Sequence, residues 1–354
     1  MKTDDRKQGV MAALLAAALF GASTPFSKLL LASIDPLLLA GLLYLGSGVG
    51  LALWIGLRRL LGTSNDEAGL QRKDWPWLSA AILAGGVVAP ILLLFGLRLT
   101  PASSASLLLN LEGVLTALLA WFVFKENFDR RIFVGMVAIL AGGVLLSWQS
   151  HPEFGVPWGS LGICGACLCW AIDNNLTRKV SAANPMQVAA IKGLVAGTVN
   201  VALAIAVGAN IPETAEIFAA GILGLVSYGV SLTGFVVALR HIGTARTGAY
   251  FSTAPFIGAA LSLIVLREQP SALFWVAGGL MAVGVWLHLT ERHAHSHHHD
   301  AMTHEHLHSH DEHHQHAHQP SDPPGEPHSH VHHHPELSHT HPHFPDIHHR
   351  HRHD

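Results

Sequence analysis

Glu112 is an ionisable residue in the middle of a long apolar stretch, residues 101–124. A charge among apolar residues is costly in free energy, so such a residue marks function by default. Its carboxyl group can carry a proton or bind a cationic group of a ligand. It can equally brace helix packing, through a hydrogen bond to a neighbour on its own helix face such as Thr116. The sequence leaves these roles open.

Asp173 and Lys192 are a second set of charges, in the apolar stretches 158–178 and 185–207. At a rise of about 1.5 Å per residue, their depths in two adjacent antiparallel helices differ by only about 4–5 Å. We therefore expect them to pair, because a partner of opposite charge makes the burial of both tolerable. The pair is either a structural ion pair or a gate that opens when a ligand or a proton competes for Asp173.

Polar and aromatic side chains accompany these charges. Trp170 and Asn174 flank Asp173 and could give a cavity an aromatic wall and hydrogen bonds. Asn110 belongs to a small polar stripe in the stretch that holds Glu112, and such stripes serve helix contact at least as often as ligand binding. No catalytic group is expected, and the candidate substrate or coupling residues are Glu112, Asp173, Lys192, Trp170, Asn174 and Asn110.

Three cysteines, Cys164, Cys167 and Cys169, lie close together in the stretch that holds Asp173. Thiolates bind copper(I) and zinc, so a soft-metal site is one interpretation. Cysteine is also a small apolar side chain, and the glycine and alanine residues around these three are typical of tight helix packing. We favour packing.

The C-terminal segment, residues 291–354, differs from everything before it. It holds 25 of the 28 histidines of the chain, interleaved with acidic residues and proline. Because it has almost no apolar residues, it cannot build a core and is expected to be disordered. Neutral imidazole suits Zn²⁺, Ni²⁺, Co²⁺ and Cu²⁺, so this tail is predicted to bind divalent metal, the alternative being a solvated low-complexity extension. The candidate ligands are His295, His297, His298, His299, His304, His306, His308, His310, His313, His314, His332, His333 and His334.

The first 290 residues are too apolar for an ordinary soluble domain. They carry 18 Lys and Arg and 14 Asp and Glu, whereas about a quarter of the residues of a soluble domain are charged. A soluble enzyme is therefore excluded, and no catalytic motif of a membrane enzyme occurs either. Nucleic acid is not expected as a partner, because the sequence lacks a basic patch with interleaved aromatic residues.

Ten apolar runs are long enough to cross a bilayer, whose core of about 30 Å needs about 20 mostly apolar residues per helix. The predicted fold is therefore an all-α membrane protein with ten transmembrane helices. The runs are 9–31, 36–57, 76–98, 101–124, 131–149, 158–178, 185–207, 215–239, 244–266 and 270–290.

Basic residues are unevenly distributed among the connections between these helices. With the N-terminus in the cytoplasm, fifteen Lys and Arg fall on the cytoplasmic side and only Lys28, Arg98 and Arg267 on the other. The positive-inside rule favours this orientation. It places both termini, and with them the histidine-rich tail, in the cytoplasm.

The membrane part repeats itself along the sequence. Lys125-Glu126 recurs as Arg267-Glu268 at a spacing of 142 residues, and a Leu-Arg pair and a glycine recur at the same spacing. This divides it into two five-helix halves, 1–149 and 150–290. An odd number of crossings orients the halves oppositely, and inverted repeats are typical of secondary transporters, which bind substrate near the midplane between the repeats. Gene duplication also produces repeats in channels and scaffolds, so these classes are the alternatives to a transporter.

Each half also contains a motif that resembles those of a known protein family. The first runs from Leu109-Asn110-Leu111-Glu112-Gly113-Val114 to Phe124-Lys125-Glu126, and the second from Ser252-Thr253-Ala254-Pro255 to Arg267-Glu268-Gln269-Pro270. Each resembles an EamA repeat of the drug/metabolite transporter superfamily, the second more closely. The resemblance implies a ten-helix transporter of small metabolites, often amino acids or related compounds, in a bacterial inner membrane. The first copy has Gly113 where such repeats usually carry proline, so a helix break there would depend on glycine.

Two kinds of substrate compete within this class. The resemblance implies export of small metabolites, whereas the tail indicates export of Ni²⁺, Co²⁺ or Zn²⁺ with the tail as collector or sensor. We favour metabolites, because the apolar runs have no interior histidine to bind metal along a path. A third hypothesis, a membrane-anchored metal store, makes the membrane part dispensable for metal handling. The expected partners are a small-molecule substrate, the lipid bilayer and transition-metal ions, with a homodimer as a further option and no required cofactor.

Overall fold

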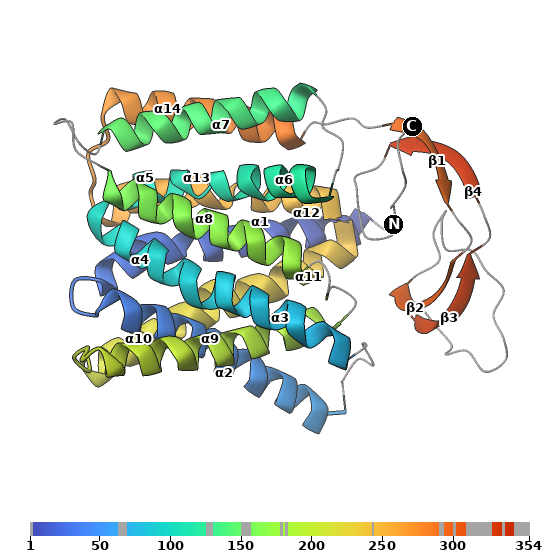
Figure 1. The fold of residues 1–354 in the computed structure, drawn as a ribbon, viewed down its shortest axis with the longest axis horizontal. Helices are drawn as coiled ribbons and strands as arrows, with labels where there is room; N and C mark the ends of the chain where they lie inside the picture. Colours follow the sequence, from blue (N-terminus) through green and yellow to red (C-terminus); the bar gives the residue numbers. More distant parts are fainter. Residues whose placement is uncertain are drawn as a thin grey trace.

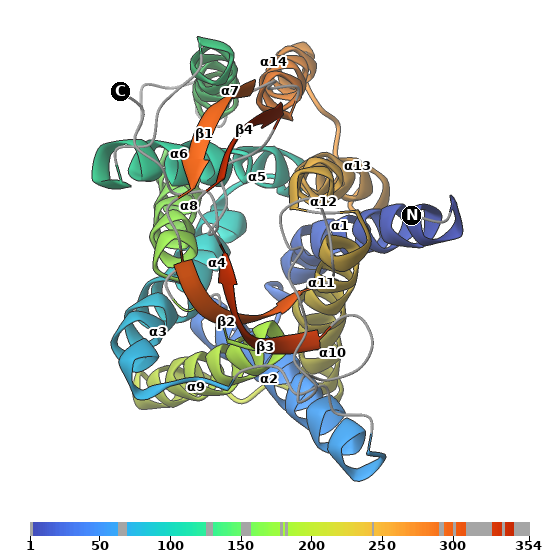
Figure 2. The same cartoon turned by 90° about the vertical axis from the view of Figure 1, so that its right-hand side faces the viewer.

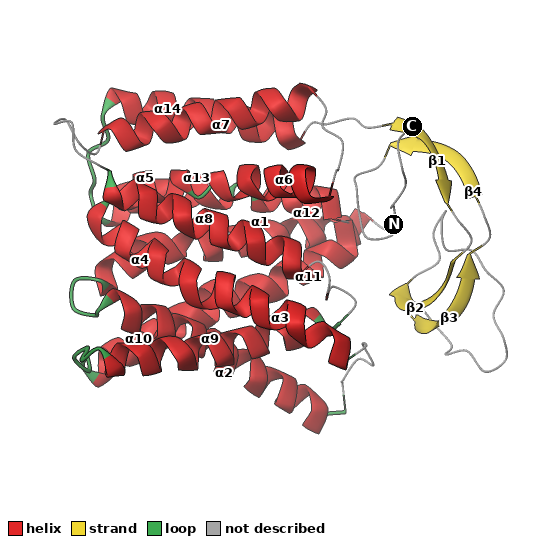
Figure 3. Ribbon diagram, in the orientation of Figure 1, coloured by secondary structure: helices red, strands yellow, loops and turns green. Residues whose placement is uncertain are grey.

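Long helices dominate the structure of the chain, which is a computed structural model (Figure 1, Figure 3). In the described part of the first 290 residues every regular element is a helix, so the prediction of an all-α membrane part is confirmed. The structure describes residues 3–62, 69–124, 130–149, 157–177, 180, 183–242, 244–289, 294–299, 302–308, 328–334 and 337–342.

Each of the ten apolar runs corresponds to one helix or to one row of consecutive helical segments. The protein is therefore a ten-helix membrane protein built as two inverted five-helix repeats. The first half comprises α1 (Thr3–Leu30), α2 (Pro36–Leu60), the row η1 (Arg72–Asp74), α3 (Trp75–Ala81), η2 (Ile82–Val88) and α4 (Ala89–Leu99), the row α5 (Ala102–Leu108) and α6 (Leu111–Phe124), and α7 (Arg130–Gln149). The second comprises α8 (Trp158–Thr177), α9 (Pro185–Ala206), the row α10 (Thr214–Gly224), η4 (Leu225–Val230) and α11 (Ser231–Ile242), the row α12 (Thr244–Phe251) and α13 (Ala254–Val265), and α14 (Ala272–Leu289).

The outer surface of these helices is apolar. Among the described residues, six helices are long and apolar enough to cross a membrane by length and composition, and shorter apolar helices accompany them. Leu53 and Trp148 are each 69% exposed and Ile264 is 73% exposed. Exposing such side chains to water would be unfavourable by about 25 cal/mol for every Å² of apolar area, and lipid removes this cost. The chain is a multi-pass membrane protein.

Helices α2 and α9, the second crossings of the two halves, begin in the same way. The Asp35 carboxylate accepts the amide hydrogen of Leu37 at 2.9 Å at the start of α2. The Asn184 side chain accepts those of Met186 and Gln187 at 2.9 and 3.1 Å at the start of α9. A proline follows each cap, where its missing amide hydrogen leaves nothing unsatisfied.

The same two helices pack against each other at very short range. A Cβ atom at Gly193 would lie 2.7 Å from the Cα atom of Gly48, and one at Gly197 would lie 2.5 Å from the backbone nitrogen of Leu45. No side chain fits at these positions, so glycine lets the two backbones approach.

The third crossing of each half contains a π-helical turn. In η2 the amide of Ala89 bonds to the carbonyl of Ala84, five residues earlier. In η4 the amide of Ser231 bonds likewise to the carbonyl of Val226. The two turns begin at residues 82 and 225, a spacing of 143 that closely matches the sequence repeat. π-Turns are rare and concentrate at functional sites.

The fourth crossing of each half is interrupted, between α5 and α6 and between α12 and α13. In the second half Pro255 lies in the first turn of α13, where it cannot supply the amide hydrogen that would continue the helix. In the first half the break includes Asn110, whose side chain donates to the Leu107 carbonyl at 2.8 Å. This break lies just before Gly113, as the break of the second half lies just before Pro255, so the dependence on that glycine stays a prediction.

The last crossings of the two halves, α7 and α14, lie side by side at one edge of the bundle (Figure 1). A Cβ atom at Gly142 would lie 2.7 Å from Met281 Cγ, and one at Gly284 would lie 2.6 Å from the carbonyl oxygen of Gly135. Glycine thus brings these two helices together, as it does α2 and α9.

Four described segments of the tail are strands. β1 (Ala294–His299) pairs with β4 (Leu337–Pro342), and β2 (Met302–His308) pairs with β3 (His328–His334), both antiparallel. The prediction of a disordered tail is therefore corrected for these segments, whose backbones find hydrogen-bond partners in the opposite strand. Both ladders lie beyond the end of the bundle at which α1 begins (Figure 2).

Candidate functional site

Asp173 of α8 and Lys192 of α9 form an ion pair. The Lys192 ammonium donates to the two Asp173 carboxylate oxygens at 2.6 and 2.7 Å. Thr177, one helical turn further on, donates its hydroxyl hydrogen to the same carboxylate at 2.8 Å. Asp173 is only 6% exposed. The structure thus shows the pairing that the sequence predicts, while the role of the pair as a gate stays a prediction.

The ion pair lies against the π-turn η2, which contacts both α8 and α9. A Cβ atom at Gly85 would lie 2.0 Å from an oxygen of the Asp173 carboxylate. Glycine is therefore the residue that lets the carboxylate approach the backbone here. This contact joins the second half of the protein, through α8, to the first half, through η2.

The carbonyl of Gly85 lacks its usual helical partner. The Ala89 amide bonds to the preceding carbonyl instead, and the next residue, Pro90, has no amide hydrogen. Tyr44 of α2 donates its hydroxyl hydrogen to the Gly85 oxygen at 2.8 Å, and Trp170 of α8 donates its indole N–H at 3.0 Å. Within a bilayer an unsatisfied carbonyl costs several kcal/mol, so these two side chains stabilise the π-turn.

Glu112 of α6 lies opposite Asn174 of α8. The Asn174 amide donates to the Glu112 carboxylate at 2.9 Å and lies 3.4 Å from the Thr116 hydroxyl oxygen. Asn174 is exposed and Glu112 partly exposed, and a Cβ atom at the neighbouring Gly113 would meet nothing within 4 Å. The Glu112 side chain is therefore less enclosed than that of Asp173.

A row of aromatic rings connects the two π-turns. The ring of Tyr44, whose hydroxyl reaches η2, lies 5.8 Å from that of Tyr228 in η4. Tyr228 in turn lies 5.9 Å from Phe20 of α1, and Phe20 lies 5.4 Å from Phe251 of α12. The row crosses from one half of the protein to the other. Aromatic faces attract apolar and cationic groups.

Two sequence-based candidates lie away from this arrangement. The Asn110 side chain is 7% exposed and is used at the break between α5 and α6, so it has a structural role there. All three cysteines are free, and Cys167 is buried with its thiol 3.8 Å from the Leu108 carbonyl oxygen. Among the residues whose side chains the structure describes, no three His, Cys, Asp or Glu gather to hold a metal ion. Cys167 thus lies in the packed interior, and a packing role for all three cysteines stays a prediction.

Sequence reasoning missed Gly85, Tyr44 and Thr177, and it missed the function of two charged residues near helix ends. The Glu268 carboxylate accepts the amide hydrogens of Ala102 and Ser103 at 2.7 and 3.0 Å, so it caps the start of α5. The Lys28 ammonium donates to carbonyl oxygens at the end of α4. The recurrence of Glu268 at the repeat spacing was the one signal that could have found its role.

The histidines of the tail take register positions in the two ladders. His295 and His297 pair with His341 and His339, while His298 pairs with Ser338 and His299 with Leu337. His304, His306 and His308 pair with His332, His330 and His328, while His333 pairs with Thr303 and His334 with Met302. The ladders thus include His328, His330, His339 and His341, which the sequence-based selection omitted. His310, His313 and His314 lie outside the described residues.

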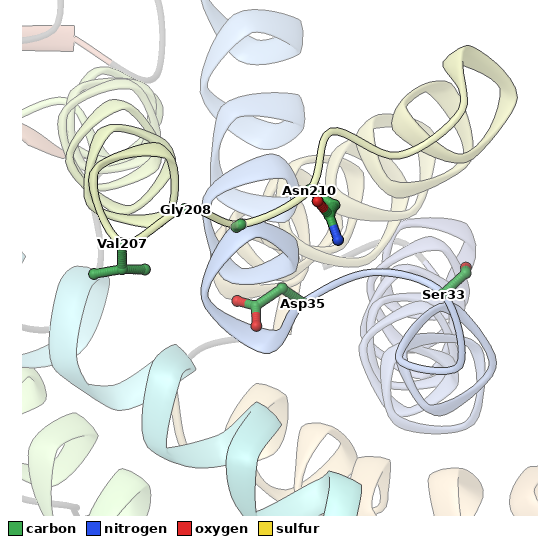
Figure 4. Close-up of a pocket in the computed structure, with 6 residues that line it drawn as sticks. Ser33, Asp35, Val207, Gly208 and Asn210 are labelled. Atoms are coloured by element: carbon green, nitrogen blue, oxygen red, sulfur yellow. The ribbon is translucent and has the colours of Figure 1, made fainter.

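A pocket of about 280 Å³ lies at the other end of the bundle, between the α1–α2 connection and the segment that follows α9 (Figure 4). The Asp35 carboxylate in it already caps α2. One of the two oxygens of the charged side chain in the pocket is therefore already engaged. It is lined by Ser33, Asp35, Val207, Gly208, Ala209 and Asn210.

Irregular backbone within a bilayer is tolerated where other protein groups or a water-filled passage satisfy it, and secondary transporters build their sites from such segments. The paired π-turns and interrupted helices, with charged groups beside them, define a membrane transporter of this class. The chain belongs to the EamA-like transporter family, whose model matches residues 7–148 and 157–290. Membership implies a small-molecule substrate and the lipid bilayer as partners.

Several known proteins are similar to this chain. One from Methanothermobacter thermautotrophicus, named an uncharacterized transporter, is 28% identical over 298 residues, which cover 80% of this chain and 86% of that protein. One from Pseudomonas paraeruginosa, named a probable 4-amino-4-deoxy-L-arabinose-phosphoundecaprenol flippase subunit ArnE, is 40% identical over 115 residues, covering 32% of this chain and 96% of that protein. A solved crystal structure shares the fold with a TM-score of 0.57 and 18% identity, covering 81% of this chain and 96% of the other.

Proposed function

We propose that this protein is a secondary transporter that exports small amino compounds, such as amino acids or related metabolites, across a bacterial inner membrane. The observation that carries the proposal is the partly exposed Glu112 side chain, whose carboxylate is held by Asn174 at 2.9 Å. A carboxylate at this depth can take up a proton or bind the ammonium group of a substrate. The adjacent aromatic rings of Trp170 and Tyr44 suit the apolar or cationic parts of such a molecule.

Glu112 is coupled to the ion pair through α8. Asn174, which binds Glu112, is the sequence neighbour of Asp173, which binds Lys192. When a proton neutralises Glu112, or the ammonium group of a substrate displaces Asn174 from it, the contact between α6 and α8 weakens and Asp173 moves relative to Gly85. Because Asp173 and Gly85 belong to different halves, this contact is the gate about which the halves rock during alternating access.

Both termini lie in the cytoplasm in this proposal, and the tail binds divalent metal there. The basic residues of the connections support the orientation. Metal bound by the tail regulates or buffers and does not pass through the membrane part. The name of the similar flippase subunits denotes a substrate with an amino group, which agrees with a carboxylate at the site.

Export of Ni²⁺, Co²⁺ or Zn²⁺ is the second candidate function, and the histidines of the tail favour it. Such a path needs nitrogen or carboxylate ligands within the membrane. Among the side chains that the structure describes, Asp173 is paired with Lys192, and no three His, Cys, Asp or Glu gather to hold an ion. We therefore favour amino compounds.

Inside-out membrane vesicles test the proposal, because export then appears as uptake. Vesicles energised to acidify their lumen are offered a panel of ¹⁴C-labelled amino acids and amino sugars. We expect the wild type to accumulate at least one of them, Glu112→Gln to lose at least tenfold in accumulation, and the exposed control Glu213→Gln to match the wild type. Equal accumulation by wild type, Glu112→Gln and vesicles without the protein would contradict the proposal.

A further inference from the structure

One register runs through both ladders of the tail. Ala294 pairs with Pro342, and His308, fourteen residues later, pairs with His328, fourteen residues earlier. The two ladders therefore keep the same pairing register. This fixes which residues share a face, because alternate residues of a strand belong to opposite faces.

Histidine is concentrated on one face of the β2·β3 ladder. That face, which we call the histidine face, carries seven histidines and one methionine: His304, His306, His308, His328, His330, His332, His334 and Met302. The opposite face has only His333 among its six positions, the others being Thr303, Glu305, Leu307, Ser329 and Val331.

The β1·β4 ladder shows the same segregation. One of its faces carries His295, His297, His299, His339 and His341 together with Leu337, and the other carries His298 as its one histidine. A tail that merely accumulated histidine would not be expected to sort it by strand face in both ladders. The sorting follows from alternation in the sequence combined with the pairing register.

We infer that the histidine face of β2·β3 is a built binding site for divalent transition-metal ions of the kind that imidazole prefers, such as Zn²⁺. This inference rests on the proposed metal-binding function of the tail and assigns it to particular residues. Directly opposed residues of an antiparallel ladder have Cβ atoms about 4.5–5.5 Å apart, and residues two apart in one strand are about 6.8 Å apart. Two neighbouring His–His pairs can therefore converge on one tetrahedral ion.

The number of ions follows from the number of ligands. At three to four imidazoles per ion, the histidine face holds about two ions and the histidine-rich face of β1·β4 holds about one. A two-stranded ladder alone is marginally stable in water. An ion that bridges its strands binds only the paired form, so metal and ladder stabilise each other.

A rearrangement of β2 that keeps the composition tests the assignment. The variant E305H/H306E/L307H/H308L retains every histidine but moves two of them to the opposite face, which leaves one of the three His–His pairs. The matched control H298S/H333T removes two histidines and leaves both histidine-rich faces intact. If composition alone determined binding, the control would lose ions and the rearranged variant would not.

The measurement is a titration of purified full-length protein in detergent with Zn²⁺ at pH 7.5, in competition with a chromophoric chelator. We expect about three tightly bound ions in the wild type and the control and about two in the rearranged variant, whose lost site weakens at least tenfold. Hydrogen exchange of the 302–308 amides should slow on addition of Zn²⁺ in the wild type and control only.

Equal binding by the rearranged variant and the wild type would overturn the assignment to the histidine face, while the tail would remain a metal binder. A wild type that binds no more Zn²⁺ than a chain truncated after Thr290 would overturn the metal function of the tail as a whole. The two failures are therefore distinguishable.

Discussion

Asp173 lies so close to Gly85 that a methyl group added at Gly85 would be 2.0 Å from a carboxylate oxygen. The two residues belong to different halves of the protein and are far apart in sequence. The carboxylate is held on its other side by Lys192 at 2.6 Å. The joint between the halves thus combines a charged contact against bare backbone with the hydrogen bond from Trp170 to the Gly85 carbonyl.

Gly85→Ala tests this joint. The added methyl group must displace Asp173 or the π-turn, so we expect the variant to lose at least tenfold in transport and to unfold at a lower temperature in detergent. Gly56→Ala is the matched control, because a Cβ atom there meets nothing within 4 Å and alanine favours helix by about 0.5–1 kcal/mol. Normal transport by Gly85→Ala would show that the contact is dispensable.

The ion pair should behave as one unit in a double-mutant cycle. Asp173→Asn and Lys192→Met each leave a charge without its partner inside the protein, which costs about 3–5 kcal/mol. The double variant leaves no unpaired charge, so its unfolding free energy should fall by no more than that of the worse single variant. Denaturant unfolding in detergent measures all three, and additive effects would exclude the coupling.

Tyr44 and Trp170 should compensate for each other at the Gly85 carbonyl. Tyr44→Phe and Trp170→Phe each remove one of two hydrogen bonds, so each should lower stability by about 1 kcal/mol. The double variant leaves the carbonyl with neither donor and should lose more than the sum. The control is Trp148→Phe at a site 69% exposed, and strictly additive losses would mean that other groups or water satisfy the carbonyl.

Glu112→Gln separates proton coupling from substrate binding. If Glu112 carries the coupling proton, the variant should lose concentrative uptake yet keep counterflow exchange, which requires no net proton movement. Its exchange rate should also become independent of pH. Loss of exchange together with uptake would instead assign Glu112 to substrate binding.

The metal affinity of the tail should collapse on acidification. Metal binds neutral imidazole, and histidine takes up a proton near pH 6–7. Lowering the pH from 7.5 to 5.5 should therefore release the bound Zn²⁺ of the full-length protein, as followed by equilibrium dialysis with ⁶⁵Zn²⁺. Zn²⁺ retained at pH 5.5 would point to carboxylate ligands.

The helices and the ion pair could be predicted from the sequence because each depends on local information. Apolar run length sets where a helix crosses the bilayer, and the depth of Asp173 and Lys192 follows from counting residues. The remainder of the site depends on contacts between distant residues. Tyr44 and Trp170 lie 41 and 85 positions from Gly85, whose carbonyl they share, and no periodicity indicates such partners.

For the tail, too, the sequence predicts only part of the structure. Its composition predicts metal binding, which stays a prediction, and composition contains no register. Only the pairing of His304 with His332, and of its neighbours in turn, reveals that the histidines share a face. The sequence predicts disorder because the tail has too few apolar residues to build a core. Strand pairing gives the backbone hydrogen-bond partners even where there is no such core.

Dual-label uptake into inside-out vesicles tests the central claim, that the membrane part carries amino compounds and not metal. Vesicles with full-length protein or a chain truncated after Thr290 receive a ¹⁴C-labelled amino compound and ⁶⁵Zn²⁺ together, followed by a wash with EDTA. We predict ¹⁴C in the lumen with both proteins, and ⁶⁵Zn²⁺ with the full-length protein alone, all of it removed by EDTA. ⁶⁵Zn²⁺ that resists EDTA and disappears in Glu112→Gln, without luminal ¹⁴C, would contradict the account and make the protein a metal exporter.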